Sequence, residues 1–290
     1  MKTRREFLSI AAGSLLFTKA ASLLGAENLA RILPLSSNKV GICDWDIRAT
    51  GSPDSFAVAK ALGFDGVQVS FETSGAHSLT EKVNRLKFID ATKTSGGAIA
   101  SLCMGLLNSH PLATTSEAES WAENCLDTMV DMDIEQVLVP FFGDADMNER
   151  KEHQPLAITK LKRLAAIAEK KRKIFAIESY LSADDHIRFI DAIGSDAIKV
   201  YYDVRNSRNK GYDIFREIEA LGKKKLISQI HLKEDKYLLG EGDINFTKVI
   251  ETLEKISYNG WLVVEGSSKG DWKESQTANA KFVKNLIGRQ

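Results

Sequence analysis

The sequence predicts an α/β protein, a single-domain (β/α)8 TIM barrel, and three observations lead to this prediction. From about residue 39 onward, short apolar runs rich in β-branched residues alternate with longer segments of helical period. Eight such strand-then-helix units occupy roughly 250 residues, the usual size of such a barrel. No Gly-x-Gly-x-x-Gly follows the first strand, and no long Pro/Gly/Ser linker divides the chain. Both absences argue against an open doubly wound sheet.

The eight predicted strands are the apolar runs of the chain. In order they are Val40–Asp44, Gly66–Phe71, Ala98–Met104, Gln136–Phe142, Ile174–Glu178, Ile198–Asp203, Ile227–Leu232 and Trp261–Glu265. The amphipathic segments between them are predicted to be helices. Examples are Ser55–Leu62, Thr80–Thr94, Glu117–Met132, Leu156–Lys171, Asp213–Leu221 and Phe246–Ile256. Glycines such as Gly63, Gly143 and Gly222 mark the joints between these elements.

The N-terminal segment has the order of an export signal. Arg4 and Arg5 precede an apolar run, residues 10–17, and small residues follow up to Ala26. The paired arginines resemble a twin-arginine signal, so we expect residues 1–26 to be cleaved and residues 27–290 to form the barrel in the periplasm. The alternative is an ordinary amphipathic helix. A stable membrane span is not expected, because the apolar run is shorter than the roughly 20 residues that a bilayer requires.

The charge balance and the cysteines exclude several classes of protein. Thirty-nine basic residues balance thirty-nine acidic ones, which gives a formal net charge of +0, and the longest basic run is only residues 170–173. We therefore expect no nucleic-acid partner. Cys43, Cys103 and Cys125 are widely spaced and form no Cys-x-x-Cys, so they are predicted to be small buried apolar residues rather than disulfides or zinc ligands.

Four ligand-type residues lie at or near the carboxyl ends of consecutive predicted strands. Glu178, Asp203, His231 and Glu265 follow one another at intervals of 25, 28 and 34 residues, about one βα unit each. Because the carboxyl ends of barrel strands meet at one mouth, we expect these side chains to converge. Three carboxylates with one imidazole suit one divalent metal ion: Mn²⁺, Co²⁺, Mg²⁺ or Zn²⁺. The alternative for each residue is a helix cap or a turn former.

Further polar residues near the predicted mouth are candidates for substrate binding. Lys233 lies two residues beyond His231, so it shares the same face of the strand; it either holds a substrate oxygen or is a solvent-exposed loop lysine. His110, in the loop after the third strand, is a candidate substrate contact. The remaining histidines lie in polar segments beside helices and are predicted to be surface residues: His77, His153 and His186.

Four aromatic residues lie at or after the ends of predicted strands. These are Trp45, the pair Phe141 and Phe142, and Trp272. They could form aromatic walls on which a sugar ring stacks. The alternative is packing of barrel loops or a subunit interface.

Motifs across the chain beyond the N-terminal segment carry a family resemblance. They are Ser55–Val67, Val139–Gly143, Ile177-Glu178, Tyr202-Asp203 with Asn206, His231–Glu234, Leu239–Phe246, and Gly260-Trp261 leading to Glu265. Together they resemble the xylose-isomerase-like barrel superfamily. That superfamily includes sugar isomerases, ketose 3-epimerases, inosose dehydratases, hydroxypyruvate isomerase, a zinc endonuclease and lyases that act on 3-keto-glycosides.

The resemblance implies roles for individual residues. The positions of Glu178, Asp203, His231 and Glu265 correspond to the metal ligands of the family, and in the epimerases the two glutamates also act as acid and base. Asn206 stands where the epimerases have a histidine, so the resemblance does not single out an epimerase. Arg205 either reaches the substrate or pairs with an acidic neighbour.

The expected activity is metal-dependent removal of a proton next to the carbonyl of a keto-sugar, through an enediolate. Export favours free sugars, oxidised glycosides and polysaccharide fragments as substrates. The leading outcome is β-elimination of a 3-keto-glycoside, which releases the aglycone. The alternatives are a ketose 3-epimerase or an aldose–ketose isomerase, and, more remotely, a non-catalytic exported sugar-binding barrel. An endonuclease is disfavoured by the near-neutral charge and by only five histidines. A homo-oligomer is left open, because barrels of this type often associate.

Overall fold

The computed structural model describes residues 35–289. The predicted export signal lies outside the described residues and stays a prediction. Among the helices that the structure describes, none is long and apolar enough to cross a membrane.

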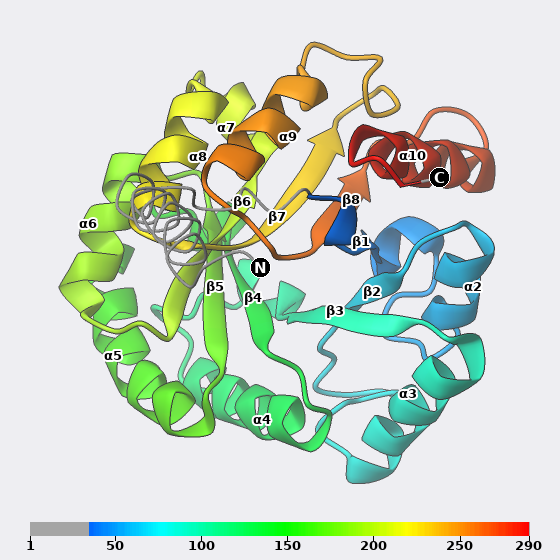
Figure 1. The fold of residues 1–290 in the computed structure, drawn as a ribbon. Coiled ribbons are helices and arrows are strands. Elements are labelled where there is room, and N and C mark those ends of the chain that lie inside the picture. The colour runs from blue at the N-terminus through cyan, green and yellow to red at the C-terminus, as the bar shows by residue number, and fades with distance from the viewer. Residues whose placement is uncertain (1–34, 290) are drawn as a thin grey trace, which may run out of the picture. The chain divides into compact units, whose positions relative to one another are not determined.

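Eight parallel strands close into one barrel in chain order, with β1 paired to both β2 and β8 (Figure 1). The strands are β1 (Val40–Cys43), β2 (Gly66–Ser70), β3 (Ala98–Cys103), β4 (Gln136–Phe141), β5 (Ile174–Ser179), β6 (Ile198–Asp203), β7 (Ile227–Glu234) and β8 (Leu262–Gly266). All eight predicted strands are confirmed, with ends that agree to within two residues. This confirms the predicted TIM barrel.

Helices connect the strands and surround the barrel (Figure 1). They are α2 (Ser55–Ala61), α3 (Lys82–Ser95), α4 (Ala118–Asp131), α5 (His153–Lys171), α6 (Ala183–Ile193), α7 (Val204–Asn209), α8 (Ile214–Lys223), α9 (Phe246–Lys255) and α10 (Trp272–Leu286). Side-chain caps fix several starts: Asp213 accepts hydrogen bonds from the first turn of α8, and Asn245 accepts one from the backbone N–H of Lys248 in α9. Such caps satisfy N–H groups that lack a partner within the helix.

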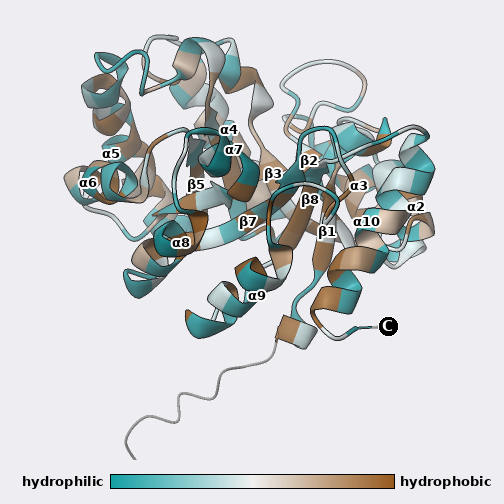
Figure 2. Ribbon diagram, turned by 90° about the horizontal axis from the view of Figure 1, so that it is seen from above, coloured by the Kyte–Doolittle hydropathy of each residue, from teal (hydrophilic) through white to brown (hydrophobic). Residues whose placement is uncertain are grey.

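The main core lies between the strands and the helices. Its large buried side chains include Phe56, Phe88, Phe141 and Phe175. Figure 2 shows strands such as β1 and β8 largely in hydrophobic colours, whereas the helices mix hydrophobic and hydrophilic residues, as expected for helices with one buried face. The barrel interior holds smaller groups of buried residues, and all three cysteines are buried, as predicted.

Gly66 allows close packing at the amino-terminal end of the barrel. A Cβ atom at this position would lie 2.4 Å from the carbonyl oxygen of Ala98 and 2.7 Å from the indole of Trp261. We expect Gly66→Ala to lower the free energy of unfolding by about 3 kcal/mol, because the backbone carbonyl of Ala98 cannot move away from the new methyl group as a flexible side chain could. Urea denaturation measures this. Gly41→Ala is the matched control: it lies opposite Gly66 in the register, yet its Cβ would meet nothing closer than 3.4 Å. Equal losses in the two variants would contradict the prediction.

His186 is buried, with 2% of its surface exposed, so the prediction that it is a surface residue is wrong. It lies on the inner face of α6, and its Nε2 is 2.9 Å from the hydroxyl of Ser179 at the end of β5. A polar sequence context does not reveal this, because the hydroxyl partner is supplied by another element. The other two histidines, His77 and His153, are half-buried.

Burial of His186 makes the stability of the fold depend on pH. Burial lowers the pKa of His186 to about 4, below the value of about 6.5 in an unfolded chain. Between these values only the unfolded chain binds the proton, so stability falls as the pH is lowered from 6.5 to 4, by at most about 3 kcal/mol. Urea denaturation at pH 7 and pH 4.5 should show that His186→Gln removes part of this loss. His110→Gln, at an exposed position, should not change it; equal pH dependence in wild type and His186→Gln would overturn the assignment.

Candidate metal and active site

The four predicted ligands meet at the carboxyl-terminal mouth of the barrel. Glu178 lies on β5, Asp203 ends β6, His231 lies on β7 and Glu265 lies on β8, and their ligand atoms all lie within 4.8 Å of one another. The Nδ1 atom of His231 is 3.2 Å from Glu178 Oε1, 3.3 Å from Glu265 Oε2 and 3.8 Å from Asp203 Oδ2. Consecutive parallel strands thus bring together residues that are far apart in sequence.

Burial and mutual charge determine the electrostatics of this cluster. Burial raises the pKa of Asp203 well above its usual value. Burial would also raise the pKa of Glu265, but His231 and Lys233 beside it bring the net pKa below its usual value. Burial opposes a charge on His231, but Glu265 and Glu178 raise its pKa to about 8. The carboxylates are therefore arranged to attract positive charge.

The donor set fits a divalent metal ion. Asp203 is only 3% exposed, so water cannot readily reach its Oδ2, and this oxygen has no hydrogen-bond partner among the described residues. A buried carboxylate oxygen without a partner costs free energy, and three crowded carboxylates repel one another. A cation bound among them would satisfy this oxygen, and oxygen donors with one imidazole suit Mn²⁺, Mg²⁺, Co²⁺ or Zn²⁺.

Lys233 and Asn206 lie beside the candidate ligands. The ammonium of Lys233 is 3.0 Å from Glu265 Oε2 and 3.7 Å from Asp203 Oδ2. Although burial opposes its charge, these carboxylates raise the pKa of Lys233 above its usual value, so it is an ammonium. Asn206 donates from its amide to Glu178 Oε1 at 3.3 Å, and its backbone N–H donates to Asp203 Oδ1.

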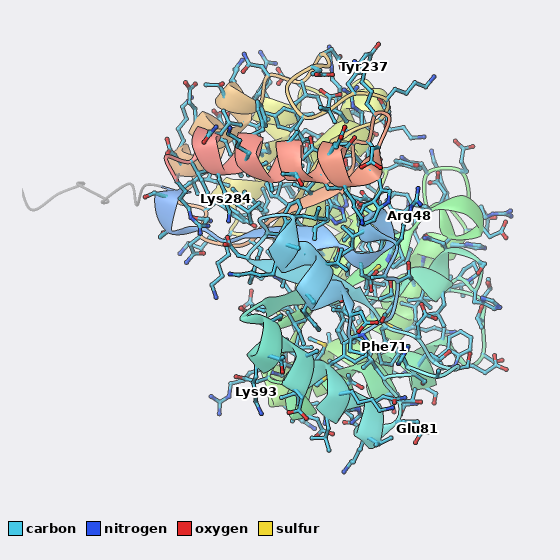
Figure 3. The ribbon with its side chains drawn as sticks, turned by 90° about the vertical axis from the view of Figure 1, so that its right-hand side faces the viewer. Arg48, Phe71, Glu81, Lys93, Tyr237 and Lys284 are labelled. Atoms are coloured by element: carbon cyan, nitrogen blue, oxygen red, sulfur yellow. The ribbon has the colours of Figure 1, made fainter. Side chains whose placement is uncertain are left out.

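Arg205 forms ion pairs with two carboxylates next to the site. Its guanidinium donates to Glu234 at the end of β7 and, at 2.7 Å, to Asp243 in the loop before α9. The carboxylate of Glu234 also accepts a hydrogen bond from the backbone N–H of Ile244. Arg205 thus ties α7 to the loop between β7 and α9, whose exposed Tyr237 stands at the upper edge of Figure 3.

A pocket of about 250 Å³ opens beside Glu178 and Glu265. Two of the predicted aromatic residues, Trp45 and Phe142, line it. The remaining residues of its lining are Ser70, Cys103, Gly105, Asn108, Leu138 and Pro140. The volume and the aromatic walls suit one sugar ring.

His110 and Trp272 are two of the predicted contacts that do not line this pocket. His110 is exposed, and its ring packs edge-on against Trp121 with the ring centroids 5.7 Å apart. Trp272 begins α10, and the guanidinium of Arg48, labelled in Figure 3, lies 5.5 Å from its ring. Neither belongs to the pocket lining that the described residues form.

The sequence reasoning missed several residues at the mouth. Asp46, one residue beyond Trp45, accepts a hydrogen bond from the backbone N–H of Gly266 at 2.7 Å. Burial and then the charge of Glu265 raise the pKa of Asp46 to about 7. The ring of Tyr180 lies 4.7 Å from that of Phe142. Gln68 was also missed, although a glutamine inside an otherwise apolar predicted strand is a detectable signal.

Comparisons with known proteins agree with this architecture. Residues 56–286 match the family model described as xylose isomerase-like TIM barrel. A search of curated proteins gave no match.

Solved structures share the fold at low sequence identity. The 3-keto-D-glucoside 4-epimerase YcjR from E. coli is 16% identical, with a TM-score of 0.70 over 86% of this chain and 98% of that one. A D-psicose 3-epimerase from Clostridium cellulolyticum H10, solved with D-tagatose, is 16% identical, with a TM-score of 0.72 over 86% and 99% of the two chains. An L-ribulose 3-epimerase is 16% identical, with a TM-score of 0.71 over 86% and 94%. From the family match and the closed eight-stranded barrel, we conclude that the chain belongs to the xylose isomerase-like TIM barrel family.

Proposed function

We propose that this protein is a divalent-metal-dependent enzyme that removes a proton from the carbon next to the carbonyl of a keto-sugar. One observation carries the proposal: two glutamates of a buried, metal-compatible cluster also line a pocket large enough for a sugar ring. Cation site and proton-transfer groups therefore lie within reach of the same ligand. Because residues 1–26 resemble an export signal, we propose that the protein acts in the periplasm.

When bound, the cation would polarise the carbonyl and stabilise the negative charge that develops on its oxygen. Glu178 and Glu265 lie on β5 and β8, which do not pair, so their carboxylates approach the pocket from different strands. One accepts the proton from the substrate carbon, and the other returns a proton or assists a leaving group. Lys233, beside Glu265, can donate a hydrogen bond to a substrate oxygen.

The substrate class that we favour is a 3-keto-glycoside, with β-elimination as the leading outcome. Its ketone acidifies the proton on C2, and loss of that proton with the substituent on C1 forms a C1=C2 double bond and releases the aglycone. The 3-keto-glucoside 4-epimerase of the same fold favours a second outcome. The ketone also acidifies C4, and loss and return of a proton there inverts that carbon. Ketose 3-epimerisation and aldose–ketose isomerisation start with the same type of step.

Solvent deuterium exchange tests the shared first step. The protein, loaded in turn with Mn²⁺, Co²⁺, Mg²⁺ and Zn²⁺, is incubated in D₂O with 3-keto-glucosides and free ketoses, and mass spectrometry follows deuterium uptake at carbon. We expect metal-dependent uptake that a chelator stops. No uptake with any cation would leave the protein a sugar-binding barrel and overturn the proposal.

A 3-keto-glucoside with a chromogenic aglycone separates the two outcomes. Metal-dependent release of the aglycone, with an unsaturated keto-sugar as coproduct, supports elimination. An epimer that forms with the aglycone still attached supports epimerisation and excludes elimination as the main reaction.

A further inference from the structure

The two ring nitrogens of His231 face different partners. Its Nδ1 faces the carboxylates of Glu178, Glu265 and Asp203 at 3.2 to 3.8 Å. Its Nε2 faces the opposite wall of the barrel, 2.8 Å from the side-chain oxygen of Gln68 on β2. A neutral imidazole carries one N–H, so the partner of Nε2 decides whether Nδ1 offers a lone pair.

The thiol of Cys43 favours one orientation of the Gln68 amide. Gln68 is completely buried, and its Oε1 accepts a second hydrogen bond, from the thiol of Cys43 at 3.2 Å. This oxygen therefore lies within hydrogen-bond distance of both the thiol and Nε2, and the amide nitrogen is turned away from both. That nitrogen has no hydrogen-bond partner among the described residues. The reversed amide would place an N–H against Nε2 and move the imidazole proton to Nδ1, where it would block the lone pair that faces the carboxylates.

Packing restricts the ring of His231, whose Nε2 lies 2.8 Å from Gln68 Oε1 and 3.5 Å from the sulfur of Cys43. The imidazole is completely buried, and the ring of Tyr201 on the neighbouring strand β6 lies with its centroid 4.3 Å away. The register places Asp203 directly opposite His231 on the same two strands. A rotation of the ring would therefore break both the Gln68 contact and the Nδ1 geometry.

We propose that Gln68 is a positioning residue of the metal site. Its side-chain oxygen holds His231 in the Nε2–H tautomer, directs the Nδ1 lone pair at the candidate cation position and so sets the affinity for a divalent ion. The inference rests on the proposed function, in that it assumes a cation bound by His231. Outer partners of this kind typically change metal affinity by about 10- to 100-fold when they are removed.

Mn²⁺ affinity, measured by competition with a fluorescent chelator, tests the proposal. Gln68→Leu removes the acceptor, and Gln68→Met is a second variant of similar length in case the first fails to fold. Both should bind Mn²⁺ about 10- to 100-fold more weakly than wild type. Gln68→Glu keeps an acceptor oxygen facing Nε2 and should bind at least as tightly as wild type.

Gln136→Leu is the matched control. Gln136 is also a buried glutamine, 5% exposed, and its side-chain oxygen has no partner within residues 35–289, but it lies at the amino-terminal end of β4, away from the candidate ligands. It should leave Mn²⁺ affinity unchanged, whatever its effect on melting temperature. The visible spectrum of the Co²⁺-loaded protein gives a second measurement, and its bands should move in Gln68→Leu and not in Gln136→Leu.

The outcomes separate this inference from the proposed function. Wild-type protein that binds no Mn²⁺ or Co²⁺ would overturn the metal site itself. Wild-type binding with unchanged affinity in a folded Gln68→Leu or Gln68→Met would overturn only the role of Gln68. Equal loss of Mn²⁺ affinity in Gln136→Leu, or weakened binding in Gln68→Glu, would mean that Gln68 only packs in the core. Either result would also overturn the role of Gln68.

Discussion

Glu178→Gln and Glu265→Gln are each expected to lower turnover by about 10³-fold, within the range typical of general acid–base groups. Glutamine keeps an oxygen that can face a cation but cannot accept the substrate proton. The two variants should differ in which step they block. Replacement of the base should stop deuterium uptake, whereas replacement of the acid should leave uptake partly intact and stop product formation.

Initial rates of uptake and of product formation at saturating metal measure this difference. Glu241→Gln is the control, because Glu241 is exposed in the loop between β7 and α9 and contacts Lys269 rather than the ligands. Its rates should equal those of wild type. Wild-type rates in both Glu178→Gln and Glu265→Gln would show that neither glutamate takes part in proton transfer.

Asp203→Asn is expected to stabilise the metal-free protein while it destroys the metal site. The substitution removes one of three crowded carboxylates, and its buried Oδ2 has no hydrogen-bond partner among the described residues. An asparagine can still cap α7 by accepting the N–H of Asn206, as Asp203 does. We expect the free energy of unfolding without metal to rise by about 1–2 kcal/mol. Mn²⁺ affinity should fall by more than the roughly 100-fold loss that an outer partner causes.

Urea denaturation in a chelator and Mn²⁺ titration measure these two opposite effects. Asp127→Asn is the control: Asp127 is exposed on α4 and pairs with Lys171, so neither quantity should change by much. Loss of stability in metal-free Asp203→Asn would show that the charge of Asp203 is compensated in the fold and would contradict the prediction.

The barrel and its four candidate ligands could be predicted from sequence because each strand and each candidate ligand leaves a local signal. The strands are short apolar runs separated by helical periods, and Glu178, Asp203, His231 and Glu265 interrupt or end such runs at intervals of one βα unit. Barrel geometry does the rest, because parallel strands bring their carboxyl ends together.

Residues whose role depends on a partner from another element could not be predicted in the same way. Gln68 meets His231 across the barrel interior, at a separation of 163 residues. His186 is buried because Ser179 offers it a hydroxyl, and the acidic partners of Arg205 come from β7 and the following loop. Sequence reasoning left both roles of Arg205 open; whether it also contacts a substrate stays a prediction.

The distribution of residues around the mouth divides the barrel into two halves with separate tasks. All four candidate ligands come from β5–β8, whereas eight of the ten residues that line the pocket come from β1–β4 or the turns that follow them. Gln68 on β2 contacts His231 across the barrel, and so links the pocket-lining half to the half that carries the candidate ligands. Under the proposed function, recombining the turns after β1–β4 with those of relatives should change the substrate preference while the candidate cation-binding half is kept.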